Sequence, residues 1–405
     1  MEPEVVVVGG GAIGVSAAYE LARRGARVTL LERDGLGSGC SAGNAGLVCP
    51  SHSAPLATPA ALREGIRSLV RSDSAFSIRP RRETLDWLAR FATACRSGNV
   101  QRATNAIRSL SIASLDLHAE LAELGTGFER RGTLSVYETG TRFAEGRKEA
   151  ARSRLRCQVL QGAEVVELEP ALAGGVAGAI FFPDEAHVDP LRYVEAIGEA
   201  AAAAGADVQT GVEVRSLTTS TVETGRGSLR PKTVVLATGV WTAPLARSVG
   251  VNLPVTGGRG YHVDLAPLPG DPRVPILIQE ARSAVTPLPG RLRVAGLLDI
   301  VGRDLRLNGA RVDAVRRAAA RVLGHDGHEL IDVWAGLRPC APDGLPVIGR
   351  PAALPSLVLA TGHAMKGISL APVTGRLVAE LVGGEAPSHE LAPFSPDRFR
   401  RARAA

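Results

Sequence analysis

The sequence predicts an α/β protein whose first unit contains a parallel sheet and whose second unit, inserted into the chain, is built on an antiparallel sheet. Two observations lead to this prediction. The first fifty or so residues run through an apolar strand, a glycine-rich turn, a helix and a second apolar strand, which is the order of a βαβ unit with parallel strands. From about residue 251, strands are separated by Gly and Pro, a pattern typical of antiparallel pairs.

A glycine motif between two apolar strands is the most informative segment. The strand Val5–Val8 enters Gly9-x-Gly11-x-x-Gly14, and the second strand stops at Glu32. The glycines permit a tight turn and a close approach of the backbone to a pyrophosphate, which the N-terminus of the following helix stabilises. The acid is placed to accept hydrogen bonds from ribose hydroxyls. The segment therefore predicts a site for the adenosine diphosphate part of a dinucleotide.

Composition excludes several classes of protein. The 405 residues are 45% hydrophobic and 22% charged with a net charge of +6, as in a globular protein of two domains. The arginines are scattered, so we expect no nucleic-acid partner. No apolar run approaches the roughly 20 residues of a membrane span, and the first strand starts too early for a signal peptide. Five dispersed cysteines indicate no metal site and a reducing, cytoplasmic setting.

We expect the two domains to be interleaved along the chain. The dinucleotide-binding domain is assigned residues 1–80, 150–250 and 330–405, and the second domain residues 81–149 and 251–329. The last segment returns to a strand, a small-residue turn and a helix, which favours its return to the first domain. Further expected elements are strands at 132–137, 180–182, 205–208, 212–217, 233–237 and 357–360, and helices at 193–204, 311–323 and 367–381.

Two later strand ends favour FAD over NAD. The segments VVLATG (234–239) and LVLATGH (357–363) each lead from an apolar strand into a small-residue turn, and no second glycine fingerprint for a nicotinamide cofactor occurs. Each segment alone is consistent with an ordinary strand end of a parallel sheet. Together they indicate an FAD-binding chain.

Four segments together identify a family. They are GGGAIG with Glu32, SAGNAG (41–46), WAGLRPCAPDGLPVIG (334–349) and ATGHAMKGISLAPVTGRLVAEL (360–381). With these segments, the sequence resembles the D-amino-acid oxidase superfamily of FAD-dependent oxidoreductases. Within the superfamily it is most similar to bacterial glycine oxidases and D-amino-acid dehydrogenases, nearly end to end. The resemblance implies a Rossmann-like FAD-binding domain, a discontinuous α+β substrate domain and oxidation of an amino acid at its C–N bond.

Residues expected to hold the cofactor belong to the glycine motif, the 41–46 segment, three strand ends and the C-terminal loop. They are Gly9, Gly11, Ala12, Ile13, Gly14, Glu32, Arg33, Ser41, Ala42, Asn44, Ala45, Gly46, Val214, Ala237, Thr238, Gly239, Trp241, His363, Ala364, Met365, Lys366, Gly367, Ile368 and Ser369. Cys340 raises the alternative of a covalent flavin link, but its spacing differs from that of the attachment cysteine in the related sarcosine oxidases. We therefore expect noncovalent FAD.

The expected reaction needs few protein groups. The substrate α-carbon gives hydride to flavin N5, and the imine hydrolyses to an oxo acid and an amine. The protein must orient the carboxylate and stabilise charge on the reduced flavin. Arg338, in GLRP, is the leading carboxylate ligand because its planar guanidinium can grip both oxygens and the matching family position binds the substrate carboxylate. The alternative is that Arg338 is a surface charge, as expected for one arginine among many.

Lys366 is the second candidate, because it is one of only three lysines in the chain. Sarcosine oxidases carry a lysine at the matching position, where it contacts the substrate carboxylate; a solvated lysine is the alternative. His52 is a weaker candidate for the same pocket. Tyr261 and His262, in GRGYHVDL, are two more, with ordinary strand residues as the alternative for both. Where relatives offer a tyrosine to the substrate, this chain has Ser283. Because serine is smaller than tyrosine, the hypothesis is a wider pocket, which suits a substrate with two carboxylates or an N-substituted glycine.

Several alternatives stay open. The substrate is glycine, a D-amino acid or an N-substituted glycine, and the electron acceptor is oxygen or a quinone. A D-amino-acid or D-hydroxyproline dehydrogenase using a quinone or another acceptor is the nearest alternative. A nicotinamide-dependent dehydrogenase and a non-catalytic flavin-binding subunit are more distant ones. A homo-oligomer is compatible with the sequence.

Overall fold

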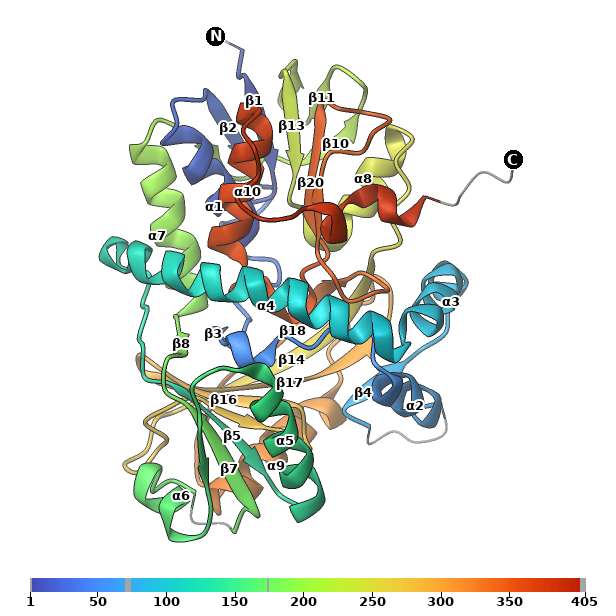
Figure 1. Ribbon diagram of the computed structural model, residues 1–405. Coiled ribbons are helices and arrows are strands. Elements are labelled where there is room, and N and C mark those ends of the chain that lie inside the picture. The colour runs from blue at the N-terminus through green and yellow to red at the C-terminus, as the bar shows by residue number, and fades with distance from the viewer. Residues whose placement is uncertain (1, 70–73, 173–174, 401–405) are drawn as a thin grey trace.

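Two sheets organise the molecule. A computed structural model describes residues 2–69, 74–172 and 175–400. In Figure 1 a largely parallel sheet with flanking helices forms the upper unit, and a large mixed sheet forms the lower unit. The long helix α4 (Ser97–Glu120) crosses between the two units.

The upper sheet has the strand order β19-β20-β13-β1-β2-β9. Its strands are β1 (Val5–Val8), β2 (Val28–Leu31), β9 (Asp207–Gln209), β13 (Thr233–Leu236), β19 (Val347–Gly349) and β20 (Leu357–Thr361). All neighbours pair in parallel except β19 with β20. Strand β1 lies centrally, with β2 on one side and β13 on the other. The expected parallel sheet is therefore confirmed.

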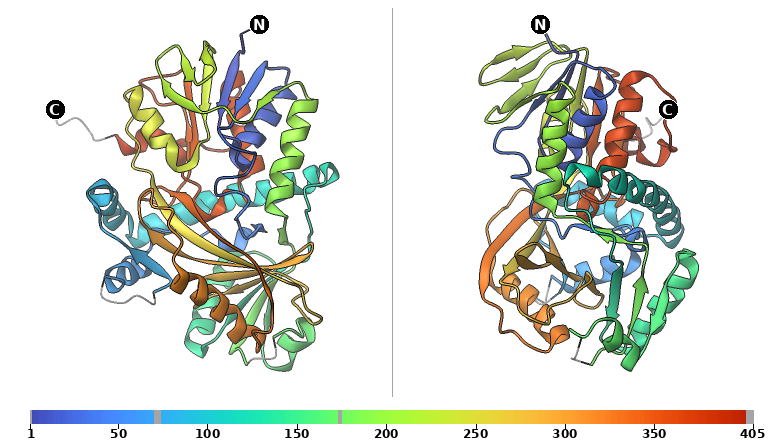
Figure 2. Two further views of the ribbon diagram at one scale, coloured as in Figure 1. Left: turned by 180° about the vertical axis from the view of Figure 1, so that it is seen from behind. Right: turned by 90° about the vertical axis from the view of Figure 1, so that its left-hand side faces the viewer.

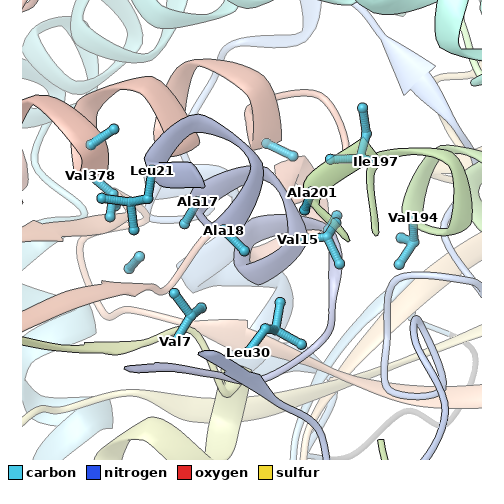
Figure 3. Packing of buried hydrophobic residues seen from close by; sticks show 14 of the residues in the cluster. Val7, Val15, Ala17, Ala18, Leu21, Leu30, Val194, Ile197, Ala201 and Val378 are labelled. Carbon is cyan, nitrogen blue, oxygen red and sulfur yellow. The ribbon is translucent and has the colours of Figure 1, made fainter. Parts of the chain in front are cut away.

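Helices α1 (Ala12–Ala22), α7 (Pro190–Ala203) and α10 (Ala371–Gly383) pack against this sheet. Figure 3 shows Val7 and Leu30 of the sheet beneath Ala17, Ala18 and Leu21 of α1, with α7 and α10 on either side. A second apolar cluster joins the sheet to α8 (Thr242–Ser248) and to the small antiparallel sheet of β10 (Val214–Leu217), β11 (Val222–Thr224) and β12 (Gly227–Leu229). Burial on both faces explains why the strands are almost wholly apolar.

The lower sheet has the order β18-β14-β17-β16-β15-β5-β7-β6, and β4 pairs with β17. Its strands are β4 (Phe76–Ile78), β5 (Thr133–Tyr137), β6 (Gln158–Leu160), β7 (Gly178–Phe182), β14 (Thr256–Leu265), β15 (Ile276–Ile278), β16 (Ser283–Leu288), β17 (Arg291–Ile300) and β18 (Leu330–Cys340). Pairing is antiparallel except for β15 with β5 and β17 with β4. Helix α9 (Gly309–Leu323) packs on one face.

The remaining α-helices and strands lie around these sheets, as the two views of Figure 2 show. They are α2 (Pro59–Arg67), α3 (Leu85–Ala94), α5 (Gly140–Ser153), α6 (Ala163–Leu168) and the short pair β3 (Leu47–Val48) with β8 (Ala186–His187). Within 2–69, 74–172 and 175–400, no helix combines the length and apolarity that crossing a bilayer requires.

The expected division of the chain changes at four strands. Strands β4, β6, β7 and β18 were assigned to the dinucleotide-binding domain, but all four hydrogen bond within the lower sheet. The reason is physical: the apolar pattern of a segment predicts that it is a strand, whereas its partners depend on tertiary packing. Helix α10 also begins later than expected, at Ala371, because residues 364–366 form a separate 3₁₀ turn and residues 367–370 form turns before the helix.

Candidate active site

The glycine motif adopts the close packing that its sequence indicated. Gly9 has φ +105°, and an added Cβ there would lie 2.7 Å from the carbonyl oxygen of Ala237. An added Cβ at Gly14 would lie 1.7 Å from the carbonyl oxygen of Gly9, so only glycine lets α1 approach β1 this closely. The first free amide of α1, that of Ala12, donates to the Ser41 hydroxyl at 3.0 Å.

Glu32 closes the end of β2 beside this turn. Its carboxylate accepts hydrogen bonds from the backbone amides of Gly10 at 2.6 Å and Asp34 at 3.0 Å. Nearby, the Arg33 guanidinium stacks on the Trp241 ring, with 4.2 Å between its Cζ and the ring centroid. Glu32, Arg33 and Trp241 all line one cavity, together with Val214.

This cavity has a volume of about 580 Å³ and extends from the glycine motif to β18. Many residues predicted to bind the cofactor line it: Gly9, Gly11, Ala12, Ile13, Glu32, Arg33, Ser41, Asn44, Val214, Ala237, Thr238, Gly239, Trp241, His363, Ala364, Gly367 and Ile368, with Arg338 at the lower sheet. Other predicted residues do not line it: Gly14, Ala42, Ala45, Gly46, Met365, Lys366, Ser369, His52 and Tyr261. Cys40, Trp334 and Arg303 also line it, and sequence reasoning did not identify them.

The 41–46 segment is fixed between the lower sheet and the C-terminal loop. Arg293 of β17 donates through Nη1 to the carbonyl oxygens of Ala42 at 2.5 Å and Asn44 at 2.9 Å. The Asn44 amide in turn donates to the carbonyl oxygen of Met365 at 3.2 Å. Asp264 holds the other edge of the Arg293 guanidinium at 2.7 and 2.8 Å. Both charged groups are buried, so their pairing rigidifies the loop.

His363 lies where the upper sheet meets the C-terminal loop. The residue is 3% exposed, and Nε2 lies 3.0 Å from the Thr374 hydroxyl. Its Nδ1 has no partner within the described part of the chain. Burial lowers the pKa of His363 to about 3, so the ring is neutral and offers an unpartnered polar atom on a cavity-lining residue.

Arg338 reaches the cavity from β18. Its Nη1 donates to the carbonyl oxygen of Leu297 at 2.6 Å, and Leu297 has φ +57°, an uncommon backbone conformation for a leucine. Among the residues that the structure describes, no ion pair of 4.0 Å or less joins Arg338 to a carboxylate. Burial lowers its pKa, while the neighbouring Cys340 and Cys40 thiols oppose this change. Asp299 opposes the change from farther away, so Arg338 is a half-buried cation with no carboxylate at ion-pair distance among the described residues.

Lys366 ends the 3₁₀ turn of the C-terminal loop, and its Nζ donates to the carbonyl oxygen of Ala54 at 3.1 Å. The surrounding protein lowers the pKa of Lys366 to about 8. His52 lies close to this ammonium group and to Arg282. Although the His52 ring is accessible, desolvation by the surrounding protein and these two cations lower its pKa to about 3. A neutral imidazole and a titratable lysine thus lie together beside the cavity.

The prediction that Tyr261 lines the pocket is wrong. Tyr261 is fully buried in the core beneath α9, and its hydroxyl contacts Arg259 and Asp299, each at 2.8 Å. Alternation along β14 explains this, because successive side chains point to opposite faces. The next residue, His262, lies on the cofactor side, with Nδ1 3.1 Å from the carbonyl oxygen of Gly43 and its ring stacked on Trp334.

Cys340 is fully buried in an apolar cluster and does not line the cavity. Its thiol donates to the carbonyl oxygen of Arg338 at 3.4 Å. Burial raises its pKa to about 12, which leaves little thiolate for attack on a flavin. These contacts are compatible with the prediction of noncovalent FAD.

The fold and this cavity define a dinucleotide-binding oxidoreductase, with the cationic side chain of Arg338 at the far end of the cavity. The chain belongs to the FAD dependent oxidoreductase family, whose model matches residues 4–381. It is 32% identical to a D-amino acid dehydrogenase of Paramagnetospirillum magneticum over 98% of this chain and 99% of that protein. It is 34% identical to D-amino acid dehydrogenase 2 of Ralstonia nicotianae over 97% and 99% of the two chains.

Solved structures agree with this assignment. Glycine oxidase from Geobacillus kaustophilus superposes with a TM-score of 0.80 at 27% identity, over 99% of this chain and all of that one. L-proline dehydrogenase from P. horikoshii has the same fold, with a TM-score of 0.75 at 21% identity over 98% of each chain. The protein is therefore an FAD-dependent oxidoreductase that acts on amino acids. The glycine turn and the unpartnered His363 Nδ1 fit the cofactor.

Proposed function

We propose that the protein oxidises the C–N bond of a small amino acid whose carboxylate binds Arg338. The observation that carries this proposal is a guanidinium in the cofactor cavity with no acidic partner among the described residues. Leaving such a cation unpaired costs free energy, and a substrate carboxylate supplies the missing anion. Each charge-assisted hydrogen bond then contributes about 1.5–3 kcal/mol.

Arg338 orients the substrate in this proposal. The bond to Leu297 fixes one edge of the guanidinium, so the remaining N–H groups present a fixed fork to the two carboxylate oxygens. Bound FAD supplies the two-electron acceptor for the C–N bond. The neutral rings of His363 and His52 add no positive charge that would oppose reaction of a substrate amine. Water then hydrolyses the imine product to an oxo acid and an amine.

A second cationic group defines the substrate class more finely. Lys366 lies beside His52 and Arg282, and Arg282 is itself paired with Glu64 at 2.6 Å. Because the charge of Arg282 is already paired, Lys366 is the cation of this group that can bind an anionic group of the substrate. We propose that it binds a second carboxylate, as in an N-carboxymethyl amino acid, or the polar end of a larger D-amino acid.

The proposed electron acceptor is a quinone or another acceptor in place of oxygen, because both curated relatives named above are D-amino acid dehydrogenases. Assays with D-alanine, D-hydroxyproline, glycine, N-methylglycine and iminodiacetate, each with a redox dye and with an oxygen electrode, test this. Turnover with the dye and little oxygen uptake is expected. Rapid oxygen uptake with the same substrates would exclude this part of the proposal.

Arg338→Met and Arg338→Lys test the carboxylate anchor. Loss of the bidentate fork is expected to lower kcat/KM about 100-fold or more, with FAD still bound. Arg306→Met, at an exposed arginine that pairs with Asp304, is the matched control and is expected to leave kcat/KM unchanged. An Arg338→Met enzyme with the wild-type kcat/KM would contradict the proposal.

A further inference from the structure

A group of metal-ligating side chains lies outside the cofactor cavity, at one end of the lower sheet. Asp271 belongs to the loop between β14 and β15, and His325 and His328 belong to the loop between α9 and β18. One ligand atom from each residue lies within 4.8 Å of the other two. We propose that Asp271, His325 and His328 form a binding site for a borderline divalent transition-metal ion, of which Zn²⁺ is the representative.

Strand pairing brings the two loops together. β14 and β18 pair antiparallel as far as Leu265 and Leu330, and the amide of Ala266 donates to the carbonyl oxygen of Glu329 at 2.9 Å. The loops that leave these two strand ends are therefore neighbours. The ligands approach each other because the sheet places them there, rather than by chance contact of long side chains.

The ligands are also oriented. Oδ2 of Asp271 accepts the Leu268 amide at 2.8 Å, which leaves Oδ1 for His328, whose Nε2 lies 2.6 Å away. Arg316 binds the carbonyl oxygens of Asp326 and His328, each at 3.2 Å, so its charge is used to hold the turn. Such second contacts fix ligand geometry before an ion arrives.

The two imidazoles complete the donor set. The His325 and His328 rings stack with centroids 4.9 Å apart and an angle of 19° between their planes. His328 is 4% exposed, Asp271 is half-buried and His325 is exposed. His328 therefore forms a buried side of the group, and His325 a side open to water. A site with three protein ligands and one water has the same arrangement.

The donor types select the class of ion. Imidazole nitrogen with one carboxylate oxygen suits Zn²⁺, Co²⁺, Ni²⁺ or Cu²⁺, whereas Ca²⁺ and Mg²⁺ prefer all-oxygen sites. Zn²⁺ binds such ligands at about 2.0–2.2 Å in a tetrahedron, so bound donors lie roughly 3.3 Å apart. The ion would replace the proton between Asp271 and His328, and a small side-chain movement accommodates it.

A second group of acids and a histidine, His262 with Asp264 and Asp332, does not offer the same opportunity. Both oxygens of Asp264 are bound by Arg293, and Nδ1 of His262 is bound to the carbonyl oxygen of Gly43. The positive charge of Arg293 also opposes a cation there. Among the described residues, no guanidinium pairs with the ligand atoms of the Asp271 group.

Titration calorimetry of the chelator-treated, FAD-loaded protein with ZnCl₂ tests the proposal. One equivalent of Zn²⁺ is expected to bind, with no comparable heat from MgCl₂. His325→Ala is the informative variant, because His325 is exposed and its loss leaves the fold intact. It is expected to weaken zinc binding at least tenfold, whereas His389→Ala, at a histidine outside the group, is expected to bind zinc like the wild type.

Thermal unfolding gives a second readout. Zn²⁺ should raise the unfolding temperature of the wild type in proportion to the logarithm of its concentration, because a ligand that binds only the folded state stabilises it by mass action. His325→Ala and Asp271→Asn should lose this rise. Absence of 1:1 binding, or undiminished affinity in His325→Ala, would mean that Asp271 and His328 form only a hydrogen-bonded pair and would overturn the proposal.

Discussion

The guanidinium of Arg338 occupies the space that a side chain at Gly260 would fill. A Cβ built on Gly260 lies 2.1 Å from Cζ of Arg338, far inside van der Waals contact. The two residues lie on the adjacent strands β14 and β18, in which Gly260 pairs with Gly336 and Gly258 with Arg338. A glycine on one strand thus makes the groove in which the proposed carboxylate anchor lies.

Gly260→Ala should therefore displace the guanidinium while sparing the fold. The clashing group is the far end of a flexible side chain, which moves at little cost in stability. We expect KM for the amino acid to rise tenfold or more, with FAD binding and the unfolding temperature close to those of the wild type. Gly140→Ala, where an added Cβ meets nothing within 4 Å, is the control. An unchanged KM in Gly260→Ala would remove Arg338 from the substrate site.

The nucleotide half of the molecule could be predicted from the sequence because its signals are local. A strand, the spaced glycines of Gly9 to Gly14, a helix and Glu32 follow one another within about thirty residues, and their packing follows from that order. The presence of Arg338 in the cavity could be predicted too, through its motif and the resemblance to known amino-acid oxidoreductases; its role as a carboxylate ligand stays a proposal.

The substrate half depends on contacts between distant segments, which the sequence does not reveal. The roles of Gly260 and Leu297 follow from the register of β14, β17 and β18. The strand pattern of GRGYHVDL already indicated that Tyr261 and His262 cannot both face the pocket, because neighbouring strand residues face opposite sides of the sheet. Without knowing which side faced the cofactor, however, Tyr261 and His262 were equivalent candidates.

Lys366 should make binding of a second carboxylate pH-dependent. Burial lowers its pKa to about 8, so the ammonium group is charged below that pH and loses its proton above it. For a dicarboxylate substrate, kcat/KM should fall as the pH rises through about 8, and this fall should be absent in Lys366→Met. D-alanine, which has one carboxylate, serves as the control substrate. A fall that persists unchanged in Lys366→Met would assign the titration to another group.

Glu185 should make stability fall as pH rises toward neutrality. Burial raises its pKa to about 7, against the opposing hydrogen bond from the Ser51 amide. The folded state then binds a proton that the unfolded state releases near pH 4.5, so the free energy of unfolding contributed by Glu185 declines from about pH 5 to above pH 7. The full decline is about 3 kcal/mol. Urea unfolding of the wild type and Glu185→Gln at several pH values measures it.

Comparing these two proteins isolates Glu185 from the buried histidines, whose lowered pKa values act in the opposite direction. Glu129→Gln is a control at another carboxylate of the same region, since Glu129 pairs with Arg131. Parallel stability profiles for the wild type and Glu185→Gln would show that Glu185 ionises normally.

FAD should leave the protein when it is denatured. The Cys340 thiol lies in an apolar cluster with a pKa raised to about 12, which disfavours attack on the flavin. Acid precipitation is expected to leave the yellow cofactor in the supernatant, for the wild type and for Cys340→Ser alike. Flavin retained in the wild-type pellet but released from Cys340→Ser would contradict this prediction.

Arg293 should link stability to cofactor binding. Burial would raise the pKa of Asp264, but Arg293 holds it below its usual value, and the same guanidinium binds the carbonyl oxygens of Ala42 and Asn44. Arg293→Met leaves a buried carboxylate whose nearest basic groups are Arg291 at 3.3 Å and His262 at 3.9 Å. We expect a loss of about 3 kcal/mol in the free energy of unfolding and at least a tenfold weaker affinity for FAD.

The double variant Arg293→Met with Asp264→Leu separates the two effects. Removing both charges relieves the unpaired carboxylate, so most of the stability should return. The carbonyl oxygens of the 41–46 segment still lack their donor, so the affinity for FAD should stay low. Denaturant unfolding and quenching of FAD fluorescence measure the two quantities on the same preparations. If FAD affinity recovers together with stability, Arg293 affects FAD binding only through the stability of the fold and does not position the 41–46 segment.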